Sequence, residues 1–90
     1  MLDLVVERYK DERAVDIYRR ARDRGRMLPE GLRYISSWVD LDYSTCFQVR
    51  ETADVGLFDR WTRSWADLID FEIVPVRTSA EAAALIAPTL

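Results

Sequence analysis

The chain contains no histidine and only one cysteine among its 90 residues. Histidine is the commonest metal ligand and the usual general base near neutral pH. Its absence excludes Ser-His-Asp and Cys-His catalysis, and a second identical chain cannot supply the missing residue. Histidine-ligated haem and the usual Cys/His zinc sites are excluded for the same reason. We therefore expect a protein without a cofactor or a bound metal.

Glycine and long apolar runs are also scarce. The three glycines, Gly25, Gly31 and Gly56, are too scattered to form a glycine-rich phosphate loop. No stretch approaches the roughly 20 apolar residues that span a bilayer, and the first residues lack the pattern of a signal peptide. The lone Cys46 has no partner for an intrachain disulfide, which fits a reducing compartment. These absences predict a cytoplasmic protein with no membrane partner.

Positive charge is limited and unevenly placed. The formal net charge is −3, which argues against a nucleic-acid partner held by a broad basic face. A cluster of arginines nevertheless crowds the end of the predicted first helix: Arg19, Arg20, Arg22, Arg24 and Arg26. Cations there favour the negative end of the helix dipole. Two interpretations stay open, a solvated cluster and a surface for an acidic partner.

The strand pattern predicts one domain over residues 1–90. β-type runs cover 2–9, 32–40, 44–51 and 71–77, and the second and third are close enough to form a hairpin. Pro75 suggests that the last strand lies at a sheet edge or contains a bulge. Amphipathic segments lie between the first and second strands and between the third and fourth. This order predicts an α+β, ferredoxin-like split βαββαβ sandwich.

The ends of the helices follow from their polar flanks. Asp11 is the predicted cap of the first helix, and Gly25 ends it. Asp54 is the predicted cap of the second, whose apolar stripe reaches Leu68. Ser79 precedes a short Ala-rich C-terminal helix over 80–87 and is its predicted cap.

The hairpin register decides which side chains share a face, and two registers are compatible with the sequence. A two-residue turn at 42–43 places Trp38 opposite Phe47 and sends Cys46 and Gln48 to the other face. A slip by one residue would place Trp38 beside Cys46 and Gln48 instead.

Three segments carry a resemblance to a known family: Arg22 to Tyr34, Cys46 to Gln48 and Trp61 to Val76. In these segments the chain resembles short bacterial proteins that share a domain of unknown function. That family is similar in architecture to the dimeric α+β barrels, in which two ferredoxin-like subunits pack their sheets together. The resemblance implies a homodimer with a small pocket between each sheet and its helices. Such relatives include cofactor-free monooxygenases, cyclases and isomerases, and fold likeness alone selects none of these.

The strand residues support the dimer independently. Apolar side chains point to both faces of the predicted sheet, as in the adjacent pairs Leu4 and Val5, and Ile73 and Val74. A sheet covered on one face alone would show a cleaner alternation. We expect a second copy of the chain to cover the second face.

Candidate site residues come from the aromatic and polar groups expected near the interface between sheet and helices. Glu72 and Gln48 are candidate catalytic groups, because an enclosed carboxyl can shuttle protons and Gln48 is a polar group within a strand. Candidate ligand-binding residues are aromatic, cationic or thiol side chains: Trp38, Trp61, Trp65, Tyr34, Arg22, Arg26 and Cys46. For each there is a simpler alternative, namely core packing for the aromatic residues and Cys46, and surface ion pairs for Glu72 and the arginines.

Two classes of function follow. The first is a cofactor-independent enzyme or binding protein for a small aromatic or enolisable molecule, of monooxygenase, cyclase or isomerase type. The second is a non-catalytic dimeric module that is structural or regulatory and whose arginine cluster meets an acidic partner. The sequence favours the first only slightly.

Overall fold

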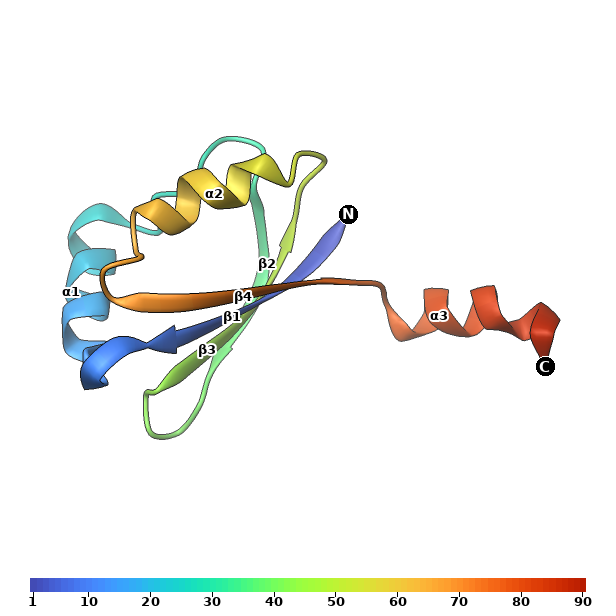
Figure 1. Ribbon diagram of the computed structural model, residues 1–90, viewed down its shortest axis with the longest axis horizontal. Coiled ribbons are helices and arrows are strands. Elements are labelled where there is room, and N and C mark those ends of the chain that lie inside the picture. The colour runs from blue at the N-terminus through green and yellow to red at the C-terminus, as the bar shows by residue number, and fades with distance from the viewer.

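The computed structural model describes residues 1–90 and contains four strands and three α helices (Figure 1). The strands are β1 (Leu2–Tyr9), β2 (Arg33–Val39), β3 (Thr45–Glu51) and β4 (Ile69–Val76), and the helices are α1 (Ala14–Arg24), α2 (Gly56–Arg63) and α3 (Ser79–Ile86). The strands form one antiparallel sheet in the order β2-β3-β1-β4. Both α1 and α2 cover the same face of this sheet (Figure 1). The predicted ferredoxin-like α+β fold is confirmed.

Several helix boundaries differ from the prediction. Asp11 does not cap α1, because Lys10–Glu12 form a separate 3-10 turn in which Asp11 has a φ of 50°. Thr78 caps α3 in place of Ser79, with its Oγ1 accepting the Glu81 N–H at 3.1 Å. The helix α2 ends at Arg63, so the last residues of the predicted apolar stripe, Trp65 and Leu68, lie in turns after the helix.

Asp54 lies one residue before Val55, the N-cap of α2, although its carboxylate accepts the N–H of Gly56, the first residue of α2, at 2.9 Å. The predictions for Gly25 and Pro75 hold. Gly25 ends α1 with φ 67° and ψ −164°, a backbone conformation that residues with a Cβ rarely adopt. β4 is an edge strand, so the missing N–H of Pro75 costs the sheet little.

The hydrophobic core lies between the helices and the covered face of the sheet. Trp61 of α2 and Leu68 are 2% and 1% exposed, and they pack with Val5 of β1 and Ile17 of α1. Core side chains come from both helices and from the strands, so this layer fixes how α1 and α2 sit over the sheet. It also leaves part of the covered face to polar side chains.

The hairpin adopts the first of the two predicted registers near its turn. Trp38 pairs with Phe47, and Val39 pairs with Cys46. An irregularity between Tyr34 and Ser36 then shifts the register, so Tyr34 pairs with Arg50. As a result the Tyr34 ring lies beside the Arg50 guanidinium, while Trp38 stays on the opposite face.

No helix covers the second face of the sheet, which we call the open face. It carries apolar side chains from all four strands: Leu4, Val6, Trp38, Phe47, Val49 and Val74. Trp38 is 59% exposed there. The C-terminal α3 projects away from the body, and every one of its residues is exposed (Figure 1). None of the helices has the length and apolar character that crossing a membrane requires.

Candidate functional site

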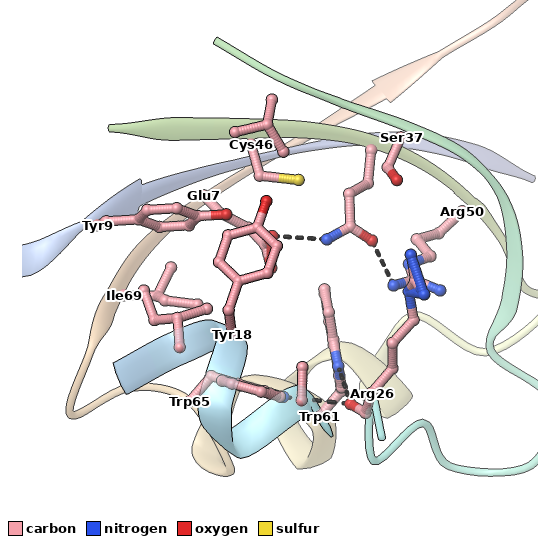
Figure 2. Close-up of a pocket in the computed structure, with 14 residues that line it drawn as sticks. Glu7, Tyr9, Tyr18, Arg26, Ser37, Cys46, Arg50, Trp61, Trp65 and Ile69 are labelled. Carbon is pink, nitrogen blue, oxygen red and sulfur yellow. Dashed lines mark hydrogen bonds between the residues drawn. The ribbon is translucent and has the colours of Figure 1, made fainter. Parts of the chain in front are cut away.

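A cavity of about 280 Å³ lies between the covered face of the sheet and the helices (Figure 2). Its apolar wall comes from both helical regions and from β4, through residues that include Ile17, Trp61, Trp65 and Ile69. Two lining residues, Tyr18 and Arg26, are exposed at the surface. The mouth of the cavity therefore lies where α1 and the segment after it face the edge strand β2.

A chain of polar side chains crosses the floor of the cavity from β1 to β3. The Gln48 amide donates to the Glu7 carboxylate at 2.5 Å, and Arg50 donates to the Gln48 carbonyl oxygen. All three side chains are buried, with Glu7 5%, Gln48 6% and Arg50 0% exposed. They meet because the pairing of β1 with β3 turns their side chains to the same face.

Burial governs the ionisation of these groups. Loss of hydration raises the pKa of Glu7, although Gln48 and Cys46 favour its ionised form. Burial also raises the pKa of the Cys46 thiol to about 12, with the nearby Glu7 charge as the second cause. Cys46 therefore remains a thiol at neutral pH, and the structure gives it no activating cation in place of the missing histidine.

Two tyrosines stand at the Glu7 end of the cavity. The hydroxyls of Tyr9 and Tyr18 lie near Glu7 and Cys46 (Figure 2). Burial raises the pKa of both phenols, so each keeps its proton at neutral pH and can donate a hydrogen bond.

The two cavity tryptophans hold the segment that follows α1. The indole N–H groups of Trp61 and Trp65 both donate to the Arg26 carbonyl, at 3.0 and 3.1 Å. This shared acceptor fixes the backbone of Arg26, whose guanidinium lies over the Tyr34 ring at 4.1 Å. Trp61 and Trp65 thus act as positioning residues for the mouth of the cavity as well as wall residues.

The structure brings together five of the nine candidate site residues: Gln48, Cys46, Trp61, Trp65 and Arg26. Tyr34 lies next to this group through its contacts with the guanidiniums of Arg26 and Arg50.

The other three candidates lie elsewhere. Trp38 is on the open face. Glu72 is on that face too, where it pairs with Arg8 at 2.9 Å, because its neighbours Phe71 and Ile73 take the covered side. Arg22 is exposed and contacts Asp23 at 2.9 Å.

Among the cavity residues that the sequence reasoning missed, Glu7 and Arg50 bear most on function. The sequence contained a signal. Asp3, Val5 and Glu7 are spaced by two residues and so share one face of the first strand, as Gln48 and Arg50 share one face of the third. This signal could be used only with the knowledge that these two strands are neighbours and that the helices cover this face.

The chain belongs to a family defined as a domain of unknown function (DUF3303), whose match extends over residues 1–90. The resemblance found in the sequence is in this respect confirmed. No curated protein and no solved structure matches the chain. Membership of this family brings no assigned activity, so function has to be argued from the cavity.

Replacing Glu7 with glutamine tests the electrostatics of the cavity. With its pKa raised, Glu7 binds its proton more tightly in the folded protein than in the unfolded chain. Stability therefore falls as the pH rises from the ordinary value of 4.5 through the raised pKa, and it stays reduced above that. We expect Glu7→Gln to raise the free energy of unfolding at pH 8 by about 1 to 3 kcal/mol.

Urea titrations at several pH values measure this effect. The difference in the free energy of unfolding between the variant and the wild type should vanish below about pH 4, where Glu7 is protonated in both the folded and the unfolded wild type. Glu30→Gln is the matched control, because Glu30 is exposed in the loop between α1 and β2 and takes part in no ion pair. An equal free energy of unfolding for Glu7→Gln and wild type at every pH would contradict the assignment of a costly buried carboxylate.

Proposed function

We propose that the cavity binds a small aromatic or enolisable molecule and that the protein catalyses a cofactor-independent, isomerase-like proton transfer on it. The observation that carries this proposal is the buried Glu7 carboxyl, which faces a cavity with apolar walls and is held by the Gln48 amide. Carboxyl groups in such surroundings serve as general bases, because burial brings their pKa closer to neutral pH.

The proposed step needs only proton transfer. The Glu7 carboxylate removes a proton from a carbon next to a carbonyl group, and the C–H electron pair becomes the double bond of an enolate. The negative charge moves to the carbonyl oxygen, where the Tyr9 or Tyr18 hydroxyl can donate a hydrogen bond. Protonated Glu7 then returns the proton to a carbon of the enolate. Charge and atoms balance without an oxidant or a cofactor.

The size and shape of the cavity support a small ligand. A volume of about 280 Å³ lies just below the usual range for small-molecule sites, and the cavity has the usual apolar walls and few polar groups. Trp61 and Trp65 offer flat surfaces for a planar molecule.

Deuterium exchange of α-tetralone, a neutral aromatic ketone, tests the proposed reaction. In D2O, NMR follows the loss of the proton signal next to the carbonyl. We expect wild-type protein to accelerate this loss above the rate in buffer. If the protein accelerates exchange neither in α-tetralone nor in any other member of a panel of enolisable aromatic compounds, the proposed reaction is wrong.

The alternative of a module that binds an acidic partner gains little from the arginine cluster. Arg20 makes a two-fold contact with Asp67, at 2.8 and 2.7 Å, and Arg22 contacts Asp23. Arg19 lies 3.7 Å from Asp16. Much of the positive charge of the arginine cluster is therefore neutralised by carboxylates of the same chain.

We further infer that a second copy of the chain covers the open face. An antiparallel sheet can leave one face in water, but that face is then mainly polar. Here Trp38 and Phe47 are 59% and 39% exposed side by side. The exposed α3 also supports this arrangement, because an isolated helix this short is only marginally stable in water unless its apolar side chains pack against another surface.

Replacing Trp38 with glutamate is expected to raise the dissociation constant of this dimer at least about tenfold, since a charge within an apolar interface loses its hydration. Analytical ultracentrifugation at micromolar concentrations measures the change. Leu41→Glu is the control, because Leu41 is fully exposed at the hairpin tip, outside the open face. A wild-type protein that sediments as a 10.5 kDa monomer would refute the dimer.

A further inference from the structure

The end of the cavity opposite Tyr9 holds two guanidinium groups, those of Arg26 and Arg50 (Figure 2). Arg50 is completely buried and makes one side-chain hydrogen bond, to Gln48. Its Nε and Nη1 atoms are buried without any hydrogen-bond partner. Most buried polar groups in folded proteins are paired, so two free donors on one buried cation need an explanation.

No carboxylate forms an ion pair with either arginine, although the charge of Glu7 acts on Arg50 from a greater distance and raises its pKa. The ion pairs of the chain involve neither Arg26 nor Arg50. Asp3 lies opposite Arg50 in the pairing of β1 with β3, but the two do not form an ion pair. Aromatic faces take the place of an anion, with the Arg50 guanidinium 4.9 Å from the Tyr34 ring and 4.8 Å from the Trp61 ring.

The pair is electrostatically unfavourable without an anion beside it. Burial, followed by the charge of Arg26, lowers the pKa of Arg50 to about 10. Arg50 is still a cation at neutral pH, so the cost of burying it is present in the folded protein. An anion bound at this end of the cavity would relieve the repulsion and offer acceptors for the missing hydrogen bonds.

We propose that the ligand of this cavity carries a carboxylate, which Arg50 binds through its free N–H groups with Arg26 at the mouth. This inference rests on the proposed function and narrows its substrate to aromatic or apolar keto acids. The carboxylate lies at the arginine end, and the acidic C–H group lies near Glu7. Indole and aliphatic side chains of the wall contact the body of the molecule.

The composition of the cavity favours a carboxylate over a phosphate group. Of the 14 lining residues, 9 are hydrophobic, and only one end is cationic. Guanidinium groups bind carboxylates and phosphates alike, so the preference rests on the mainly apolar walls, which suit a small anionic group attached to an apolar body. The Glu7 carboxylate at the other end would repel a second anionic group.

Binding of matched acids and esters tests the inference. The probes are benzoate, phenylacetate and phenylpyruvate, each with its methyl ester, and titrations followed by NMR of the protein give the affinities. Charged hydrogen bonds predict that at least one acid binds about ten- to a hundredfold more tightly than its ester. In Arg50→Met this preference should disappear, while Arg63→Met, which changes an exposed arginine of α2, should retain it.

Each outcome decides the matter. Equal binding of acid and ester, no binding of any acid at millimolar concentration, or a preference that survives in folded Arg50→Met would overturn the inference. Stabilisation by inorganic phosphate without binding of any acid would also overturn it. Replacing a buried charged residue with methionine is often tolerated, and a circular dichroism spectrum checks the fold. If Arg50→Met does not fold, the comparison of acid with ester in the wild type still decides.

Failure of the proposed function gives a different result. If the acids bind with the expected preference but the protein accelerates no exchange at the benzylic carbon of phenylpyruvate, the carboxylate site stands and the catalytic proposal falls. If α-tetralone and methyl phenylpyruvate undergo catalysed exchange but acids have no advantage over esters, the catalytic proposal stands and the carboxylate site falls.

Discussion

Replacing Trp61 with alanine is expected to lower the free energy of unfolding by about 3 to 5 kcal/mol. Trp61 is 2% exposed and contacts the Phe71 ring edge-on at 5.4 Å between centroids. Its indole N–H also donates to the Arg26 carbonyl, and its ring faces the Arg50 guanidinium. One substitution thus opens a cavity in the core and removes a hydrogen bond and a cation–π contact. For a domain of this size, stability is itself only about 5 to 15 kcal/mol.

Thermal unfolding followed by circular dichroism measures the loss. A destabilisation of that size corresponds to a fall in Tm of at least about 12 °C for a domain of this length. Trp61→Phe keeps most of the volume but removes the N–H donor, so its loss should be smaller. Leu41→Ala is the control, because Leu41 is fully exposed at the hairpin tip. Equal Tm values for Trp61→Ala and the control would show that α2 does not anchor the core as described.

Replacing Glu7 with glutamine is expected to lower the catalysed exchange of α-tetralone by a factor of about 100 to 10 000, the usual contribution of a positioned general base. Glutamine has nearly the same shape and can still accept from the Gln48 amide, so the cavity keeps its form. The loss would therefore report the missing basic group. Because the proposed base acts as a carboxylate, the wild-type rate should rise with pH through the raised pKa of Glu7, and the variant should lack this rise.

Glu72→Gln separates the proposed base from the acid that the sequence had suggested. Glu72 lies on the open face and pairs with Arg8, so its replacement should leave the rate of exchange within about twofold of the wild type. If Glu72→Gln lost the activity and Glu7→Gln retained it, the catalytic group would have to lie on the open face, contrary to our proposal.

The fold was largely predictable because its local signals agree with one another. The strand over 2–9 was predicted to the residue, and the hairpin follows from two β-type runs separated by a short connection. Helix ends were less accurate. Asp11 is a good capping residue, but the chain uses it in a 3-10 turn, and the choice between Thr78 and Ser79 depends on a single residue of register.

The candidate site was only partly predictable because strand alternation does not tell which face is covered. On β1, Leu4 and Val6 suggest the buried face, yet the helices cover the face with Val5 and Glu7. The more apolar side is the open one. Because the sequence did not show which face the helices cover, Glu72 on β4 was chosen as the candidate acid and Glu7 was overlooked.

Tryptophan spacing was informative where it reflects a continuous helical stripe. Trp61 and Trp65 follow the period of α2 and the turn after it, and both reach the cavity. The position of Trp38 depends instead on the hairpin register, which the sequence left open. The irregularity in β2 near Ile35, which brings Tyr34 to Arg50, had no glycine or proline to indicate it.

The positions of the three tryptophans give this protein intrinsic optical reporters. Trp61 and Trp65 share the cavity wall, and Trp38 stands alone on the opposite side of the sheet. In a Trp38→Phe background, all indole fluorescence comes from the wall, so a molecule that enters between α1 and β2 changes emission without any attached dye. With Trp61 and Trp65 as the only emitters, events inside the protein can be observed separately from those on its outer surface.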